Sequence, residues 1–268
     1  MARRIAVAAT APFGADVLER LAGHHDVALL LTRPDKPRGR GRKLAPPPAK
    51  ETAERLGIPV SQPATLDETV GLGADTVVVC AYGLLIPESL LERALWLNVH
   101  PSLLPRWRGA APVERALMAG DARTGVTIHR TIAELDAGPV AAQRAFDVGP
   151  DDDAGSVYAR SAEIAAELLD EVLARPEPAF TPQSEDGVTY AEKIRPEDRE
   201  LDLSRPAPEL VDRIRALSPH IGARAVVDGR PLIVWRARAA ADGSLELLEV
   251  QPEGRRRMPY DEYLRGLR

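Results

Sequence analysis

The chain has 268 residues, 44% of them hydrophobic, and a formal net charge of −5. That length exceeds one average domain, and the apolar content is enough to build a sizeable core. The negative charge argues against a protein that coats nucleic acid indiscriminately, because such proteins carry a large positive excess.

The first half of the chain alternates short apolar runs with helical patterns. We expect strands at Ile5 to Ala9, Val27 to Leu31, Thr76 to Cys80, Leu97 to Val99 and Val126 to His129, and helices around Val17 to Leu21 and at Lys50 to Leu56. Continuous apolar strands separated by helices predict an α/β fold with a doubly wound, mostly parallel, Rossmann-like sheet. Ligands of such sheets bind beyond the carboxyl ends of the strands.

The N-terminal residues run directly into the first strand and show no small-residue cleavage site. No segment approaches the roughly 18 uninterrupted apolar residues of a membrane span. Cys80 is the single cysteine, so an intrachain disulfide and a cysteine-based zinc site are both excluded. We therefore expect a cytoplasmic protein, monomeric and without a metal.

Positive charge is dense in a segment between the second and third predicted strands, and a second basic run lies at 255–257. The basic residues of the first segment are Arg33, Lys36, Arg38, Arg40, Arg42 and Lys43, against the single acid Asp35. Charge runs that contain glycine and proline are commonly solvated loops. On an acidic chain, however, a local basic patch also suits one particular anionic partner.

The densest group of unusual residues is the segment LNVHPSLLPRWRG, Leu97 to Gly109, which begins on a predicted strand and continues past its carboxyl end. Asn98 and His100 are two residues apart, so an extended backbone projects both side chains to the same face. An amide and an imidazole would then meet at the carboxyl edge of the sheet. Arg106 and Arg108, in the same segment, are candidates either to neutralise phosphates or to brace the loop.

A third group is needed to orient the imidazole or to balance its charge. The loop Glu134 to Gly138 offers Asp136, which alone would be read as a turn residue. Helices are expected at Val113 to Ala119 and at Ser156 to Leu173, and the second of these should close the domain.

The last third of the chain changes character. Residues 181–203 begin without apolar periodicity and predict a linker between a domain at 1–180 and a smaller one at 204–268. In the smaller domain we expect a helix at Glu209 to Leu217, then strands at Ala223 to Val227, Leu232 to Ala237 and Leu245 to Val250, with Asp-Gly turn signals at 228–229 and 242–243. Short antiparallel strands of this kind form a small barrel or meander.

Together these motifs resemble the folate-dependent formyltransferases. The resemblance rests on Asn98, His100 and Asp136, on the loop Ser102 to Gly109, and on the segments Thr124 to Thr127 and Leu135 to Gly138. Within that family the likeness is greatest to the members that act on initiator methionyl-tRNA, because the basic segment looks like their insertion and the C-terminal part looks like a shortened form of their OB-like β-barrel domain. It extends over nearly the whole chain.

The resemblance implies a function and a set of site residues. It implies formyl transfer from 10-formyltetrahydrofolate to the α-amino group of methionyl-tRNA during translation initiation, with Asn98, His100 and Asp136 as catalytic residues. It implies folate contacts from Ser102, Leu103, Leu104, Pro105, Tyr82, Leu84, Leu85 and Ile86. It also implies tRNA contacts from Arg38, Arg40, Arg42 and Lys43.

Three other functions remain open. An N-formyltransferase that acts on an amino-sugar nucleotide would need the same catalytic residues, although not the basic segment or the C-terminal strands. A non-catalytic folate- or RNA-binding module would bind the donor without turnover. A hydrolase would release formate from the donor in the absence of an amine.

Overall fold

The computed structural model describes residues 2–38 and 43–267. Within these ranges no helix is long and apolar enough to cross a membrane. The chain separates into two compact units, the first made of residues 1–108, 125–145 and 159–189, and the second of residues 109–124, 146–158 and 190–268. The segment predicted as a linker is therefore divided between the units after residue 189.

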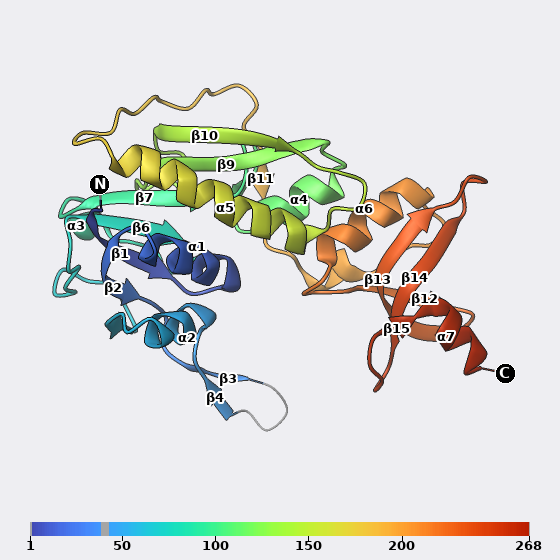
Figure 1. Cartoon of the computed structure of the whole chain (residues 1–268). Coiled ribbons are helices and arrows are strands. Elements are labelled where there is room, and N and C mark those ends of the chain that lie inside the picture. Colours follow the sequence, from blue (N-terminus) through green and yellow to red (C-terminus); the bar gives the residue numbers. More distant parts are fainter. Residues whose placement is uncertain (1, 39–42, 268) are drawn as a thin grey trace. The chain divides into compact units, whose positions relative to one another are not determined.

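The first unit is built on a seven-stranded sheet with the order β10-β9-β7-β6-β1-β2-β5 (Figure 1). Its strands are β1 Arg4–Ala9, β2 Asp26–Leu31, β5 Val60–Ser61, β6 Thr76–Cys80, β7 Leu95–His100, β9 Arg123–Arg130 and β10 Val140–Asp147. The pairings from β5 through β2, β1 and β6 to β7 are parallel, and β9 joins β7 antiparallel. This confirms the predicted α/β fold with a mostly parallel sheet.

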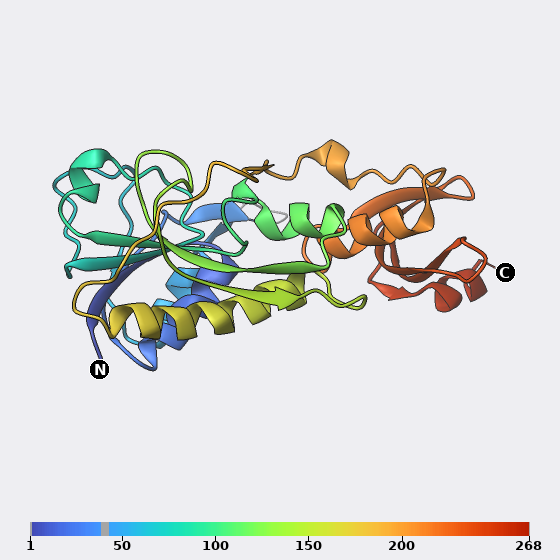
Figure 2. The same cartoon turned by 90° about the horizontal axis from the view of Figure 1, so that it is seen from above.

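Helices cover both faces of this sheet, as the unbroken apolar strands predict. Figures 1 and 2 show α1 (Pro12–Ala22) and α5 (Ala154–Leu173) on one face and the short α3 (Glu88–Leu91) on the other. On the α3 side, Ala6, Ala8, Val77, Val79 and Trp96 form a buried cluster with residues that follow β6. The helix α2 (Pro48–Arg55) packs against α1.

The first turn of α1 lies unusually close to the sheet because of Gly14. A Cβ placed at Gly14 would lie 2.5 Å from the carbonyl oxygen of Cys80 and 2.8 Å from the Cβ of Ala9. Only glycine allows this approach. It fixes the start of α1 beside the carboxyl ends of β1 and β6, the edge where ligands of such sheets bind.

Two short two-stranded sheets lie outside the main sheets. The hairpin β3 (Lys36–Arg38) and β4 (Lys43–Ala45) pairs antiparallel, and β8 (Arg108–Gly109) pairs with β11 (Tyr190–Ala191). At the base of the hairpin, the carboxylate of Asp35 accepts bonds from Lys50 at 2.9 Å and from Gln62 at 2.7 Å. These bonds lower the pKa of Asp35 below its usual value, with Gln62 the larger cause.

The second unit contains a four-stranded antiparallel sheet with the order β12-β13-β14-β15. Its elements are α4 Pro112–Met118, the 3-10 helix η1 Pro196–Arg199, α6 Ala207–Leu217, β12 Ala223–Val227, β13 Arg230–Ala239, β14 Leu245–Pro252, β15 Met258–Pro259 and α7 Tyr260–Arg265. The hairpin turn at 228–229 has φ of 49° and 74°, as a two-residue turn with a right-handed twist requires. The predicted small β domain is confirmed, and Leu210, Ile214 and Val234 lie in its core.

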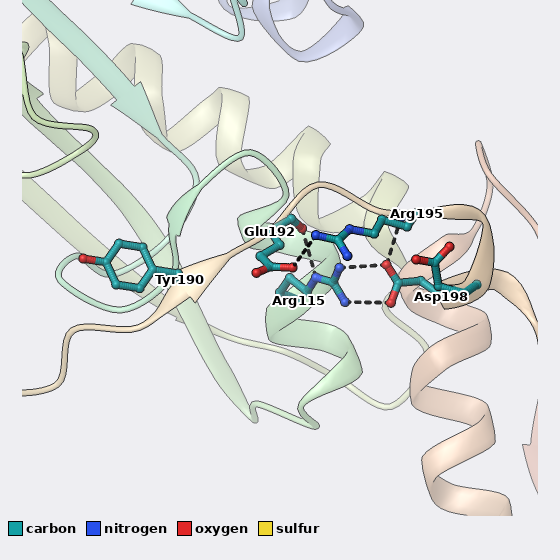
Figure 3. Close-up of a pocket in the computed structure, with 6 residues that line it drawn as sticks. Arg115, Tyr190, Glu192, Arg195 and Asp198 are labelled. Atoms are coloured by element: carbon teal, nitrogen blue, oxygen red, sulfur yellow. Dashed lines mark hydrogen bonds and ion pairs between the residues drawn. The ribbon is translucent and has the colours of Figure 1, made fainter.

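Within the second unit, Arg115 of α4 holds the segment that leads into η1 (Figure 3). Its guanidinium donates to both carboxylate oxygens of Asp198, at 3.1 and 2.8 Å, and to the backbone carbonyls of Glu192 and Lys193. An open hollow of about 370 Å³ is lined by Arg115, Tyr190, Glu192, Arg195, Glu197 and Asp198. The bond from Arg115 is the main reason that the pKa of Asp198 lies below its usual value.

Replacing Arg115 with methionine should destabilise this unit by about 1.5–3 kcal/mol at pH 7, the typical worth of hydrogen bonds to a charged group. Because the pKa of Asp198 is lowered on folding, this contribution is present above the unfolded value near 3.8 and is lost as the pH falls through the folded value. Urea unfolding at pH 7 and in acid would measure both. Arg195→Met is the control, since its partner Glu192 is exposed; equal losses in the two variants would contradict the prediction.

Candidate active site

The candidate site begins on β7, at the carboxyl edge of the sheet. Asn98 and His100 project from the same side of this strand, as their spacing predicts. The side chain of His100 is only 5% exposed, and that of Asn98 is half-buried. On the neighbouring strand β9, His129 lies opposite Asn98 and Thr127 lies opposite His100.

Asp136 reaches both residues from the loop that joins β9 to β10. One of its carboxylate oxygens accepts a bond from the Asn98 amide at 3.0 Å, and the other lies 3.6 Å from Nδ1 of His100. The loop bends back sharply: Asp136 has φ of 50°, and a Cβ at Gly138 would collide with the carbonyl of Arg130. The structure therefore brings together the three residues that the sequence motifs single out.

The second ring nitrogen of His100 fixes the tautomer of the imidazole. Nε2 donates to the backbone carbonyl of Trp107 at 2.8 Å, because a carbonyl can only accept. Burial lowers the pKa of His100, and the Asp136 carboxylate offsets part of that effect. A ring that is neutral at pH 7 therefore presents the lone pair of its Nδ1 to Asp136. The imidazole and the carboxylate can together bind one additional proton.

His129 completes the cluster, although the sequence patterns gave it no role. Its Nδ1 donates to the carbonyl of Arg130 at 3.1 Å, so Nε2 is an acceptor and receives the Asn98 amide at 3.0 Å. The two N–H groups of Asn98 are thus bound to His129 and to Asp136. The side chain of His129 is 2% exposed, and its ring lies edge-on to His100 with centroids 6.4 Å apart.

Replacing His129 with leucine should lower the free energy of unfolding by about 1–3 kcal/mol, because a buried N–H of Asn98 loses its acceptor. Chemical denaturation would measure the loss. Arg130→Ala is the matched control, since it changes an exposed neighbour and keeps the backbone carbonyl that His129 binds. A leucine variant as stable as the control would show that the hydrogen bond contributes nothing.

The loop that follows β7 is held by hydrogen bonds within itself and to β9. The buried Ser102 donates to the carbonyl of Arg106 at 2.7 Å, and the backbone of Leu104 bonds to Thr127 at 3.2 Å. The peptide bond between Leu104 and Pro105 is cis. The Ser102 hydroxyl and the Leu104 amide are therefore committed to the shape of the loop, and Leu103 and Pro105 are half-buried.

The other predicted folate contacts follow β6. Tyr82 and Ile86 are buried in the hydrophobic cluster beside the sheet, and Leu84 packs against it. Leu85 instead is 85% exposed. Leu85 is therefore the exposed apolar side chain of this stretch, whereas Tyr82, Leu84 and Ile86 pack into the core. Burial raises the pKa of Tyr82 to about 12, so its hydroxyl stays protonated.

Two of the four predicted tRNA contacts lie on the β3–β4 hairpin. Arg38 ends β3, and Lys43 begins β4 and is exposed. Arg40 and Arg42 lie outside the described residues. Among residues 2–38 and 43–267, no group of three or more His, Cys, Asp or Glu side chains could hold a metal ion.

Comparison with known families matches both parts of the chain. Residues 3–173 match the model of the family described as "Formyl transferase", and residues 193–241 match "Formyl transferase, C-terminal domain". The methionyl-tRNA formyltransferase of Paracoccus denitrificans is 41% identical over 98% of this chain and 97% of its own length. That of Halorhodospira halophila is also 41% identical, over 100% of this chain and 97% of its own.

Solved structures share the fold at lower identity. The methionyl-tRNA formyltransferase from Clostridium thermocellum superimposes with a TM-score of 0.66 at 15% identity, over 94% of this chain and 99% of its own. An N-formyltransferase from Helicobacter canadensis, solved with folinic acid and dTDP-3-aminofucose, gives 0.66 at 16% identity, over 90% of this chain and 88% of its own.

Proposed function

The chain belongs to the methionyl-tRNA formyltransferase family of formyl transferases, and on this premise we propose that it transfers a formyl group from 10-formyltetrahydrofolate to the α-amino group of methionine on initiator methionyl-tRNA. The observation that carries the proposal is the buried cluster of Asn98, His100 and Asp136 at the carboxyl edge of the sheet. It supplies the polar groups that formyl transfer to an amine requires, in the fold that the family shares.

The reaction begins with attack of the neutral amine on the formyl carbon. A C–N bond forms, and the carbonyl oxygen becomes an oxyanion of a tetrahedral intermediate. Donors already in place lower the energy of that oxyanion, and removal of one typically costs about 10²–10³ in rate. Asn98 is a donor at the site, and His100 becomes a second donor when its Nδ1 is protonated, because its Nε2–H is bound to the Trp107 carbonyl. Both N–H groups of Asn98 are engaged, so contact with the oxyanion requires one of them to leave His129 or Asp136.

The attacking nitrogen must then lose a proton, and N10 of the folate must gain one as its bond to carbon breaks. The facing lone pairs of His100 Nδ1 and Asp136, 3.6 Å apart, can hold one proton between them. Taking it from the amine and returning it to N10 balances the reaction. A positioned acid–base group of this kind contributes about 10²–10⁴ to the rate.

Substrate contacts follow from the placement of the remaining residues. The loop Ser102 to Pro105 and the exposed Leu85 would line the folate site, and the β3–β4 hairpin with Lys43 would meet the phosphates of the tRNA acceptor end. Phosphate binding by lysine and arginine weakens steeply with salt. We therefore expect the KM for tRNA to rise with ionic strength while the KM for folate changes little.

The test is formyl transfer from 10-formyltetrahydrofolate to charged initiator methionyl-tRNA. The same tRNA with its α-amino group acetylated is the negative control, and an amino-sugar nucleotide is the competing acceptor. Transfer to the free amine of the tRNA alone supports the proposal. Transfer to the sugar alone, formate release without an acceptor, or folate binding without turnover would each overturn it in favour of another function.

A further inference from the structure

Residues 183–189, at the end of the last segment of the first unit, are bonded to the loops of the candidate site. Gln183 lies in the first unit together with Asn98, His100 and Asp136. Its amide nitrogen donates to the backbone carbonyls of Asp136 and Gly138, at 2.7 and 2.8 Å. Its amide oxygen accepts from Arg108, at 3.2 and 2.9 Å. Both N–H groups of this side chain are therefore used, and its oxygen takes two bonds.

Arg108 anchors the other end of this contact. It is 7% exposed, and its guanidinium also lies 3.6 Å from the carboxylate of Glu134, in the same loop as Asp136. Of the two roles open to Arg108 from the sequence, the structure favours bracing the loop. Because a guanidinium has a fixed planar fork, it orients the Gln183 amide as well as binding it.

Thr189 holds the second partner of His100. Its hydroxyl accepts the backbone N–H of Trp107 at 2.9 Å, and its carbonyl accepts the N–H of Arg108 at 2.9 Å. Trp107 is the residue whose carbonyl receives Nε2 of His100. The segment 183–189 thus contacts the backbone of both residues that bind the two ring nitrogens of His100.

Those two residues share an uncommon backbone. Asp136 has φ of 50° and Trp107 has φ of 67°, in the left-handed region that side chains other than glycine rarely adopt. Such conformations persist when surrounding contacts over-determine them, and they cluster at functional sites. The described contacts that do so here include those from Gln183 and Thr189.

We propose that Gln183 is a positioning residue for formyl transfer: it holds the loop of Asp136 at the distance from His100 at which the pair can exchange a proton. This inference rests on the proposed function. It adds a residue from outside the family motifs, and it assigns a role at the site to a segment whose pattern predicted only a linker.

Two substitutions separate this role from folding. Gln183→Glu keeps the acceptor for Arg108 but loses both donors to the loop, and Gln183→Leu loses every bond. In both variants we expect kcat to fall by about tenfold to a hundredfold, because small displacements of a reacting group carry losses of that size. The KM for folate and for tRNA should change less than threefold. Glu185→Gln, an exposed neighbour, is the control that should retain full activity.

The pH profile of kcat is the readout that a purely structural role would not move. Asp136 and His129 are the ionisable groups that face His100, and of these Asp136 raises the pKa of His100 while His129 lowers it. A loop released from Gln183 lets Asp136 move away, so the acidic limb of the profile should shift to lower pH in both variants.

The outcomes are distinct. If the wild-type chain formylates methionyl-tRNA while the glutamate variant, folded by circular dichroism and thermal unfolding, keeps both its kcat and its pH profile, then the inference about Gln183 is wrong and the function stands. If the wild-type chain does not transfer a formyl group, the proposed function itself fails.

Discussion

Replacing His100 with alanine is expected to lower kcat for formyl transfer by about 10²–10⁴, the range typical of a lost acid–base group. The imidazole is the centre of the cluster, with one nitrogen on the Trp107 carbonyl and the other facing Asp136. Alanine removes the imidazole and with it both of these contacts. The KM for folate should change little, because the donor site that we propose is walled by the loop backbone and by the stretch that follows β6.

The measurement is steady-state transfer to charged methionyl-tRNA, beside His24→Ala as a matched histidine control. His24 is exposed and bonds to Asp170 at 2.7 Å, far along the chain from the motif residues. The control should keep its activity. A His100 variant that retains more than a tenth of the wild-type kcat would remove His100 from the chemistry.

The stability of the His100 variant should also depend on pH in a defined direction. Because burial lowers the pKa of His100 in the folded state, the unfolded chain binds its proton more readily. The wild-type contribution of this group is therefore full above the unfolded value near 6.5 and is lost as the pH falls below it. The alanine variant should lose less stability than the wild type between pH 7 and pH 5.

Much of the site follows from sequence patterns because its residues lie on strands. The two-residue spacing of Asn98 and His100 fixes a common face on any extended backbone, and β7 obeys it. The position of His129 on strand β9 also determines which residue it meets. It lies opposite Asn98 in the antiparallel register, but this becomes visible only once β9 is known to be the neighbour of β7.

The parts that sequence could not supply are held by hydrogen bonds between loops. The approach of Asp136 to His100 depends on a left-handed backbone and on two backbone carbonyls bound by Gln183. Residues 181–189 have no apolar periodicity, because they bond to other loops instead of packing a helix or strand face into a core. Composition therefore makes such a segment look like a linker, and only its partners reveal that it belongs with the site.

Exchange of Asp136 for asparagine should lower kcat by about 10²–10⁴ and leave the fold intact. Asparagine has nearly the same shape, and it is among the residues that best tolerate the left-handed backbone found at this position. The loop should therefore keep its course, with its carbonyls on Gln183. What changes is the negative charge 3.6 Å from Nδ1 of His100.

Without that charge, His100 and residue 136 can no longer hold a proton between them. The carboxylate of Asp136 is the first of the influences that raise the pKa of His100 against the effect of burial, so its removal lowers the pKa of His100 further. The acidic limb of the kcat profile should then move to lower pH in the variant, and the rate at its plateau should stay depressed. Lowering the pH cannot restore it, because the variant lacks the carboxylate that shares a proton with His100. A variant whose kcat recovers fully at lower pH would instead show that Asp136 acts only by raising the pKa of the imidazole.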